Sequence, residues 1–387
     1  MTLDLASMTV LLLRAPVRRP MRTSFGALHD RPALLVRLED RQGAVGWGEA
    51  YCNNPPGAGE HRAGLLRAVF LPLMDGRRFD TPEALYRHLT ARTRSLALQC
   101  AEPGPFAQCI CAIDIAAWDL VARRAGQTLR SALGGAPAID VPAYLSGLDP
   151  DGPERLAQAG WEAGHRAFKM KLGFGRDTDL RNAQATRATL GPGVPIAMDV
   201  NQAWDSAETQ HMAPRLAPFD PLWLEEPMPA DTPLEAWSEL ARHCPLPLAA
   251  GENLRGEPAF DAAIASRAFA VLQPDPIKWG GLSALAPLAR RVTAAGLRFC
   301  PHYLGGGIGL VAAAQLAAAA GPDSLVEVDE NENPLRELLA TPFPAIRGGR
   351  MVLPDGPGVG VVPDLVASRP HLALQWSHRF EAREEPE

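Results

Sequence analysis

Seven ionisable residues recur at nearly even intervals through the second half of the chain. They are Lys171, Asp199, Glu225, Glu252, Asp275, His302 and Glu327. Successive members lie 23 to 28 residues apart; the interval is shortest between Glu252 and Asp275 and longest between Lys171 and Asp199. One strand, one helix and their loops fill such an interval. Charges scattered over a surface have no reason to keep this register, so the pattern predicts a site assembled from strand ends.

Three of the seven are acids on consecutive intervals: Asp199 in MDVNQ, Glu225 in WLEEP and Glu252 in AGEN. On adjacent strands their carboxylates would converge, which is unfavourable unless a cation lies among them. Oxygen ligands select a hard ion, and Mg²⁺ usually keeps positions open for substrate, so we predict Mg²⁺ here. The alternative is that each acid caps the helix after its strand. Glu226 competes with Glu225, and strand alternation predicts that only one of the two points inward.

Two candidate bases flank these acids. Lys169 and Lys171, in FKMKLG, are two apart on a predicted strand and therefore share a face. Two neighbouring ammonium groups should lower each other's pKa, which would help one act as a neutral base while the other holds a substrate carboxylate. His302, in FCPHYLGG, follows a later strand, and Asp275, in LQPDP, is placed to orient its ring. The two bases would then approach a substrate α-carbon from opposite faces.

Glu327, on the last predicted strand, is a further candidate. It could hydrogen-bond a substrate carboxylate, or stabilise an enolic oxygen if it is protonated.

The elements that must position these residues are short apolar runs that alternate with Ala-rich helical stretches after Asp140. Such alternation predicts parallel βαβ units, and eight of them predict an α/β fold with a closed (β/α)-barrel whose last unit is incomplete. The runs are 141–146, 166–172, 194–200, 221–224, 246–250, 268–272, 297–300 and 325–328.

The first hundred or so residues have a different pattern. Runs at 33–38 and 44–49, separated by EDRQG, predict a hairpin, and helical patterns follow near 61–70, 82–91 and 106–124. We therefore predict a small N-terminal α+β domain at 1–130 and a barrel domain at 131–345. The Pro/Gly-rich C-terminal segment, 346–387, is expected to return to the small domain and to end in a frayed acidic tail.

Composition narrows the partners. The chain is 47% hydrophobic and 21% charged, with a net charge of −6 and no basic block, which argues against nucleic acid and anionic membrane but not against an anionic substrate. We expect no targeting segment and no stretch able to span a membrane. The six cysteines are scattered, so we expect no disulfide framework and no metal site at Cys109 and Cys111. Their pattern predicts a reducing, cytoplasmic location.

Taken together, these motifs resemble the mandelate racemase subgroup of the enolase superfamily. A sister subgroup, with muconate cycloisomerase and dipeptide epimerases, has a lysine where this chain has Asp275. The resemblance extends to residues 112–135 and to GWGEA at 46–50, and VEVDENENPLRE at 326–337 is similar to acid-sugar enzymes of the subgroup, including a galactarolactone cycloisomerase. The motifs that carry it are Lys169-x-Lys171, Asp199-x-Asn201, Glu225-Glu226-Pro227, Gly251-Glu252-Asn253, Asp275 and His302.

This resemblance implies a modified barrel under a capping domain, and it implies roles. Asp199, Glu225 and Glu252 would bind Mg²⁺, with Lys171 as one general acid/base and His302 with Asp275 as the other. Lys169 and Glu327 would contact the substrate carboxylate, assisted by Asn201. The capping domain would set specificity through residues 22–29 and 51–57. There Arg22 is a candidate for a distal carboxylate, or simply a solvated loop arginine. A homo-oligomer, from dimer to octamer, is expected.

The predicted function is Mg²⁺-dependent removal of the proton α to the carboxylate of a small molecule, through an enediolate. Dehydration of an acid sugar to a 2-keto-3-deoxy acid is the first choice. Racemisation or epimerisation of a 2-hydroxy acid and cycloisomerisation of a sugar-acid lactone are alternatives. Readings from other classes are a Schiff-base barrel with Lys171 as nucleophile and a catalytically inactive barrel that binds a partner.

Overall fold

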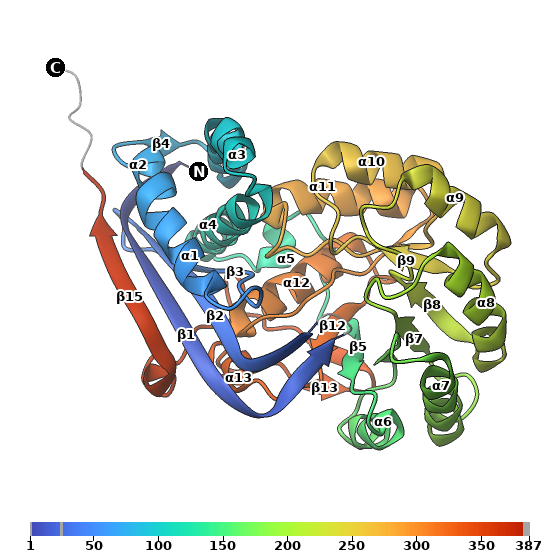
Figure 1. Ribbon diagram of the computed structural model, residues 1–387. Coiled ribbons are helices and arrows are strands. Elements are labelled where there is room, and N and C mark those ends of the chain that lie inside the picture. The colour runs from blue at the N-terminus through green and yellow to red at the C-terminus, as the bar shows by residue number, and fades with distance from the viewer. Residues whose placement is uncertain (1, 24–25, 382–387) are drawn as a thin grey trace.

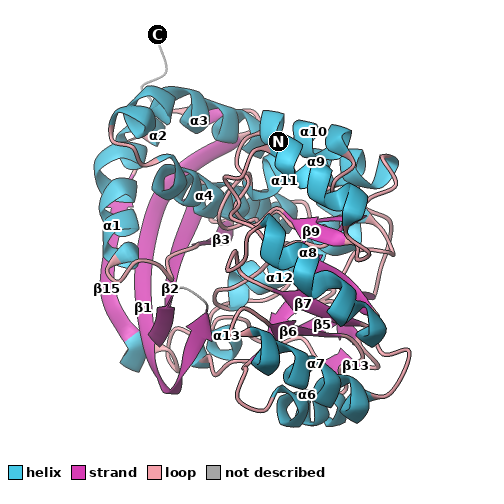
Figure 2. Cartoon of the chain, turned by 45° about the vertical axis from the view of Figure 1, so that its right-hand side comes forward, coloured by secondary structure: helices cyan, strands magenta, loops and turns pink. Residues whose placement is uncertain are grey.

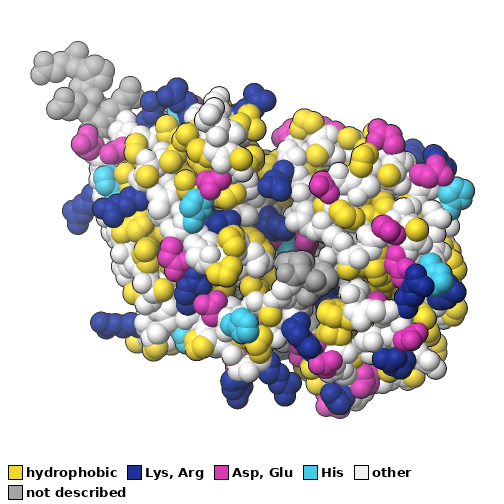
Figure 3. All heavy atoms as spheres, viewed as in Figure 1, with side chains coloured by type: hydrophobic (Ala, Val, Ile, Leu, Met, Phe, Trp, Pro, Cys, Tyr) yellow, Lys and Arg dark blue, Asp and Glu magenta, His cyan; other side chains and the backbone are white. Residues whose placement is uncertain are grey.

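The computed structural model describes residues 2–23 and 26–381. An N-terminal sheet with its helices lies beside a bundle of parallel strands wrapped by helices (Figures 1 and 2). Acidic and basic side chains are interspersed over the face in Figure 3. Residues 24 and 25 of the predicted specificity loop, and residues 382–387 of the predicted tail, lie outside the described residues.

The N-terminal part is built on an antiparallel sheet in the order β15-β1-β2-β3, with β4 pairing to β1. The predicted hairpin is present, because residues 34–39 of β2 pair antiparallel with residues 45–50 of β3. The long first strand and the strand contributed by the C-terminus were not predicted. The strands are β1 (Leu3–Thr23), β2 (Gly26–Asp40), β3 (Val45–Ala50), β4 (Arg78–Phe79) and β15 (Leu372–Arg379).

Helices cover one face of this sheet (Figure 1). Thr81 caps α3 by accepting a hydrogen bond from the Ala84 N–H, and Pro82 occupies the first turn, where its missing N–H costs nothing. Gly126 ends α4 with a φ of 66°. The helices are α1 (Ala58–Leu65), a π-helical turn (Leu66–Phe70), α2 (Leu71–Met74), α3 (Pro82–Gln99), α4 (Pro103–Arg124) and α5 (Leu129–Ala132).

The expectation that no segment is apolar enough to cross a membrane needs one correction. Helix α4 passes that test by length and composition among the described residues. It lies between the sheet and the barrel, and 83% of its apolar window is buried inside the structure. Its hydrophobicity is therefore that of a core helix.

The second part is the predicted (β/α)-barrel, but among the described residues the ring of strands is not closed by ladders all the way round, whereas the sequence predicted a closed barrel. Eight parallel strands follow in ring order, and within the described residues ladders join every neighbouring pair except β11 and β12. They are β5 (Asp140–Leu148), β6 (Phe168–Lys171), β7 (Ile196–Asp199), β8 (Pro221–Glu225), β9 (Leu248–Ala250), β10 (Val271–Leu272), β11 (Arg298–Phe299) and β12 (Val326–Asp329).

A helix follows each strand, and the last is only one turn long, as the incomplete final unit predicted. They are α6 (Pro153–Glu162), α7 (Arg176–Leu190), α8 (Ser206–Leu216) with a 3₁₀ turn (Ala217–Phe219), α9 (Leu234–His243), α10 (Glu257–Ser266), α11 (Gly281–Ala294), α12 (Gly307–Ala320) and α13 (Pro334–Leu338).

Inward-facing side chains explain why the polar residues gather at one end. The lower layer of the interior is apolar and consists of Tyr144, Ala167, Ala197, Trp223, Ala249, Val271 and Cys300. Two positions further along come Ser146, Lys169, Asp199, Glu225, Gln273 and His302, which are buried. Because side chains alternate with a period of two, the second set points into the same interior, one layer nearer the carboxyl ends of the strands.

The C-terminal segment first contacts the barrel. Strands β13 (Ile346–Arg347) and β14 (Arg350–Val352) form a hairpin, and β14 pairs antiparallel with β5. A bridge between Thr128 and Gly358 then brings the chain to the start of α5. After a 3₁₀ turn (Arg369–His371), β15 completes the N-terminal sheet beside β1. The segment therefore ties the two parts together.

Candidate active site

The two lysines of FKMKLG lie inside the barrel, on β6. The Lys169 ammonium is fully buried and contacts Glu225 Oε1 at 2.6 Å and Glu327 Oε1 at 2.9 Å, with Asp199 Oδ2 at 3.8 Å. Lys171 Nζ contacts Asp199 Oδ2 at 2.6 Å and donates to Asn201 Oδ1 at 2.8 Å. Both side chains thus share the interior face, as their spacing predicted.

The prediction that the paired ammonium groups leave one lysine with a lowered pKa is wrong for this arrangement, although Lys169 does act to lower the pKa of Lys171. Burial lowers the pKa of Lys169, but Glu225 and Glu327 outweigh it and hold that pKa well above its ordinary value. Burial likewise lowers the pKa of Lys171, and Asp199 outweighs both burial and Lys169, so this pKa is also raised. The carboxylates lie closer to each ammonium than the sequence spacing alone could indicate.

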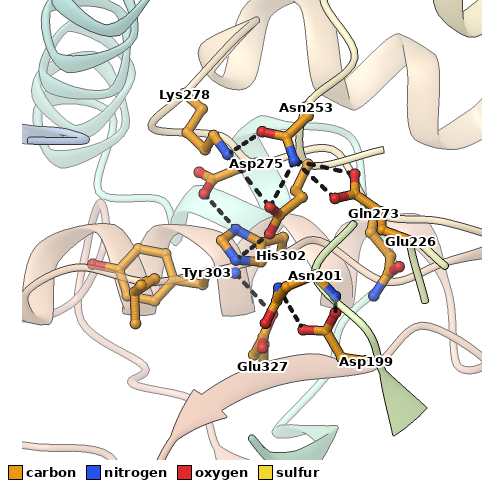
Figure 4. A network of polar contacts seen from close by, with 12 residues as sticks. Asp199, Asn201, Glu226, Asn253, Gln273, Asp275, Lys278, His302, Tyr303 and Glu327 are labelled. Atoms are coloured by element: carbon orange, nitrogen blue, oxygen red, sulfur yellow. Dashed lines mark hydrogen bonds and ion pairs between the residues drawn. The ribbon is translucent and has the colours of Figure 1, made fainter. Parts of the chain in front are cut away.

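His302 is held through both ring nitrogens (Figure 4). Its Nδ1 lies 2.7 Å from Asp275 Oδ2 and its Nε2 lies 2.6 Å from Glu252 Oε2. The other Asp275 oxygen accepts from the Ile277 N–H at 2.8 Å, which fixes the carboxylate. Burial lowers the pKa of His302, but Glu252 and Glu327 outweigh it, so the pKa is raised well above the ordinary value. The structure therefore brings the predicted pair together and adds Glu252 to it.

Glu327 lies between the lysine and histidine groups. Its Oε1 contacts Lys169 and accepts from the Ser146 hydroxyl, and its Oε2 accepts from the Tyr303 N–H at 3.1 Å. Burial raises its pKa, but Lys169 and His302 outweigh it and bring the pKa to about 2. In this arrangement the two cations favour the carboxylate form of Glu327 over the protonated form.

Two of the predicted metal ligands, Asp199 and Glu225, end the adjacent strands β7 and β8, and Glu252 lies two residues beyond the end of β9. Glu225 Oε2 accepts from Trp223 Nε1 at 3.0 Å and from Gln273 Nε2 at 2.7 Å. Burial and the Asp199 carboxylate raise the pKa of Glu225 to about 7, which shows that the two acids repel each other. Within residues 2–23 and 26–381, no three acids, histidines or cysteines are grouped so as to hold a metal ion as they stand. Asp199, Glu225 and Glu252 are instead paired with Lys171, Lys169 and His302.

Glu226 departs from the expected alternation. Strand β8 ends at Glu225, and Glu226 takes a φ of 36°, in the left-handed region. Its buried carboxylate accepts from Asn253 Nδ2 at 2.8 Å, and the same amide donates to Glu252 Oε1 at 2.8 Å. Both acids of the Glu-Glu pair therefore reach the polar cluster. The prediction that only one does so is wrong because the strand ends between them.

Lys278 is the principal residue that the sequence did not reveal. Its partly buried ammonium lies 3.7 Å from Glu252 Oε1 and donates to Asn253 Oδ1 at 3.0 Å. Burial lowers its pKa, but Glu252 and the neighbouring acidic groups of Tyr51, Asp275 and Glu226 together outweigh burial and raise that pKa. It follows Asp275 by three residues, within one turn, and that proximity was the available signal.

Arg22 lies near the end of β1 and pairs with two acids that are not part of the polar cluster inside the barrel. Its guanidinium pairs with Asp149 at 2.7 Å and with Asp151, and its side chain is 45% exposed. It lines a cavity of about 1070 Å³ between the β1–β2 hairpin and the loops that follow β5 and β12. Neither Lys171 nor His302 lines that cavity among the described residues. In this structure Asp149 and Asp151 neutralise the Arg22 guanidinium, which was predicted to bind a distal carboxylate of the substrate.

The fold and the site together define a class of protein: a (β/α)-barrel under a smaller α+β domain, with two candidate bases around a cluster of strand-end acids. Residues 7–134 match the mandelate racemase/muconate lactonizing enzyme N-terminal domain, and residues 153–367 match the enolase C-terminal domain-like family. The chain belongs to the enolase superfamily, in its mandelate racemase subgroup.

Solved structures of relatives agree over nearly the whole chain. A mandelate racemase/muconate lactonizing enzyme from Bordetella bronchiseptica RB50 is 47% identical, with a TM-score of 0.89, over 96% of this chain and 100% of that one. A racemase from Streptomyces coelicolor A3(2) with bound magnesium is 26% identical, with a TM-score of 0.86, over 95% and 100%. Magnesium binding is thus found within the family.

D-galactarolactone cycloisomerase from Agrobacterium fabrum is 31% identical over 370 residues, which cover 90% of this chain and 94% of that protein. Other relatives are arabinonate, talarate/galactarate and xylonate dehydratases, and racemases of N-succinylated amino acids. The relatives are therefore enzymes that share a superfamily but differ in substrate and reaction.

Proposed function

We propose that this chain removes the proton α to the carboxylate of an acid sugar and eliminates the β-hydroxyl, giving a 2-keto-3-deoxy acid. The observation that carries the proposal is the order of contacts around the barrel. Lys171 pairs with Asp199 at 2.6 Å at one end of the acid series, and His302 pairs with Glu252 at 2.6 Å at the other. Two proton-transfer groups therefore lie on opposite sides of three acids.

The donor set fits magnesium. Asp199, Glu225 and Glu252 supply only oxygen, and the raised pKa of Glu225, about 7, marks a place where burial and Asp199 disfavour a second negative charge. Magnesium would be held by these three acids and, when bound, would offset the negative charge that develops on the substrate carboxylate.

Lys169 would stabilise the same charge. Removing an α-proton places a second negative charge on the substrate carboxylate, which is why that proton is a very weak acid. The buried Lys169 ammonium is fixed by Glu225 and Glu327 and needs no reorganisation as this charge develops. Asn201, which accepts from Lys171 Nζ at 2.8 Å, holds that amine toward the acids.

The two bases would then divide the proton transfers. With Asp199 and Glu252 holding the metal instead of pairing with these side chains, one of Lys171 and His302 would take the α-proton in its neutral form, and the electron pair of the C–H bond would form the enediolate. The other donates a proton to the β-hydroxyl, which leaves as water when its C–O bond breaks. The resulting enol becomes the 2-keto acid. Asp275 orients the imidazole through Nδ1, so Nε2, now 2.6 Å from Glu252 Oε2, is the nitrogen that would transfer a proton once Glu252 binds the metal.

Cycloisomerisation of a sugar-acid lactone is the second candidate, and the 31% identity to D-galactarolactone cycloisomerase favours it. The proton-abstraction step would be shared, and the leaving group would be the ring oxygen of the lactone. Racemisation or epimerisation would need only reprotonation from the opposite face. The products separate these outcomes.

A screen of acid sugars and their lactones, with formation of a 2-keto acid as the readout, tests the proposal. EDTA should abolish turnover and Mg²⁺ should restore it, whereas an inactive barrel would show no turnover and a Schiff-base barrel no metal requirement. Lys171→Ala and His302→Ala should each lose turnover by about 10²- to 10⁴-fold. Undiminished activity in both variants would overturn the assignment of roles. We also propose that the chain is a homo-oligomer, which sedimentation equilibrium would test.

A further inference from the structure

Two groups of residues, held in different ways, make up the site. The lysine side comprises Lys169 and Lys171, which lie within β6. The histidine side comprises Asp275 and His302, which lie three residues beyond β10 and β11, each only two residues long. Loop residues need support that a strand ladder does not give.

Helices α11 and α12, which follow the two loops of the histidine side, begin after Gly280 and Gly306. Glycine has no side chain that could cap the free N–H groups of a first helical turn. Buried acids of the N-terminal part satisfy these groups instead. Asp114, on α4, accepts from the N–H groups of Leu282 at 2.6 Å and Ser283 at 3.0 Å.

Glu49, at the end of β3, does the same for α12. It is 1% exposed, and its carboxylate accepts from the Gly309 N–H at 2.9 Å and from the Gly306 N–H. A Cβ placed on Gly306 would lie 3.0 Å from Glu49 Oε1, so a side chain there would displace the acid. The glycine run that follows His302 therefore lets Glu49 reach the backbone between His302 and α12.

The residues after Glu49 contact both loops of the histidine side. The Tyr51 N–H donates to the Ile277 carbonyl at 3.1 Å, and Asn53 Nδ2 donates to the Leu304 carbonyl at 2.7 Å. The Tyr51 ring lies under the Lys278 ammonium at 5.2 Å. Ile277 and Leu304 each lie two residues after a member of the histidine side. Residues 49–53 therefore form hydrogen bonds with both loops.

The lysine side has a support of its own within the barrel. Asp179, on α7, accepts from the N–H groups of Gly173 at 3.0 Å and Phe174 at 3.2 Å, directly after Lys171. Asp179 is 1% exposed. The same device, a buried acid on backbone N–H groups, thus supports both sides, but its source is the barrel in one case and the N-terminal domain in the other.

From these contacts we infer that Glu49 and Asn53 are positioning residues for His302 and Asp275, so that the N-terminal domain sets the geometry of one of the two bases and not of the other. The inference rests on the proposed function, because it assigns different proton transfers to the two sides. A substitution within residues 49–53 should therefore slow proton transfer by His302 and leave proton transfer by Lys171 nearly unchanged.

Deuterium exchange at C2 in D₂O tests this inference, with two C2 epimers of whichever acid the wild-type protein accepts. Lys171→Ala and His302→Ala first assign each epimer to its base. In Glu49→Gln the side-chain oxygen can still accept from one of the two N–H groups, of Gly306 or of Gly309. The other N–H then faces the side-chain NH₂ group, which cannot accept a hydrogen bond. We expect exchange of the epimer assigned to His302 to fall on the order of 10²-fold, the cost of a displaced reacting group. Exchange of the epimer assigned to Lys171 should change by less than about 3-fold. A change that small would show that Lys171 has not been displaced.

Asp179→Asn is the matched control, and it should reverse the selectivity by affecting the epimer assigned to Lys171. Asn53→Ala removes a single hydrogen bond and covers the case in which Glu49→Gln does not fold. Equal losses for both epimers in Glu49→Gln and Asn53→Ala would overturn the inference. Failure of the wild-type protein to exchange any acid would count against the proposed function instead.

Crystal structures of Glu49→Gln and Asn53→Ala give a readout that needs no substrate. We expect the contact between His302 Nδ1 and Asp275 Oδ2, now 2.7 Å, to lengthen or break, while the contact between Lys171 and Asp199, now 2.6 Å, persists. An unchanged histidine side in both variants would contradict the inference whatever the activity shows.

Discussion

The lysine side and the histidine side of the site differ in how they are built. Lys171 pairs with Asp199 in the parallel ladder between β6 and β7, so two neighbouring strands fix that contact. Asp275 and His302 lie on loops, and residues 49–53 of the N-terminal domain form hydrogen bonds with these loops. A barrel can thus position one base with its own strands and leave the other to an added domain. We infer from this difference that the N-terminal domain acts on the chemistry by positioning one of the two proposed bases.

Loss of the buried ammonium on the lysine side should have the largest effect. Lys169→Met leaves Glu225 and Glu327 buried without their cation. The free energy of unfolding, measured in urea without added metal, should fall by about 3–5 kcal/mol. Arg176→Met, which breaks an exposed ion pair to Glu208, is the control and should leave stability unchanged. Equal effects of the two substitutions would contradict this account of the lysine side.

The acid that supports α11 should make stability depend on pH. Burial raises the pKa of Asp114 from 3.8 to about 7, so between these values the folded protein keeps a proton that the unfolded chain has lost. Stability from this group is complete below pH 3.8 and is lost as pH rises through 7, by up to about 4 kcal/mol. In Asp114→Asn the amide can accept from Leu282 and donate to Ser283 Oγ, so its unfolding free energy should lack this decline.

Wild-type protein and Asp114→Asn are compared by urea unfolding from pH 4 to pH 8. The difference between the two curves isolates Asp114 from the other buried acids. Parallel curves would show that the interface keeps this carboxylate ionised and would remove the predicted pH dependence.

Magnesium should stabilise the fold through the acids between the two sides. At a Mg²⁺ concentration one hundred times its Kd, the free energy of unfolding should rise by about 2.7 kcal/mol. Asp199→Asn should remove most of this gain. Asp205→Asn is a matched control, because Asp205 caps α8 by accepting from the Glu208 N–H at 2.7 Å, away from the acid series. A full magnesium response in Asp199→Asn would exclude Asp199 as a ligand.

The smallest effect is expected at Arg22. Arg22→Ala should change stability by less than about 1 kcal/mol, because its ion pairs with Asp149 and Asp151 are solvated. If Arg22 meets a distal carboxylate, KM should rise for a diacid and stay constant for a monoacid. Arg291→Ala, which removes an ion pair to Asp261 elsewhere, should alter neither KM. An unchanged KM for the diacid would leave Arg22 as a structural arginine.

The sequence predicted the strand-borne part of the site well. Strand spacing placed Lys171, Asp199 and Glu225 at neighbouring strand ends, and the period of two placed Lys169 and Lys171 on one face. Both rules hold because a ladder fixes register and direction. The barrel and the hairpin of β2 and β3 followed from the same local signals.

Other features lay beyond local rules. The alternation argument failed at Glu226 because the backbone turns left-handed there, which a sequence does not reveal for a glutamate. The pKa prediction for the lysines failed because it counted the charges along one strand and not those across the barrel. The supports from Glu49 and Asp114 were missed because they join residues about 170 to 260 positions apart. Strand β15 was missed because its partner is at the other end of the chain.

The account depends on two proton-transfer groups that act from opposite sides, and deuterium incorporation at C2 measures this most directly. Wild-type protein with Mg²⁺ should exchange the C2 proton of an accepted acid sugar. Lys171→Ala should retain exchange of one C2 epimer only, and His302→Ala should retain exchange of the other only. If both variants exchange both epimers at the wild-type rate, the assignment of Lys171 and His302 as opposed bases is wrong.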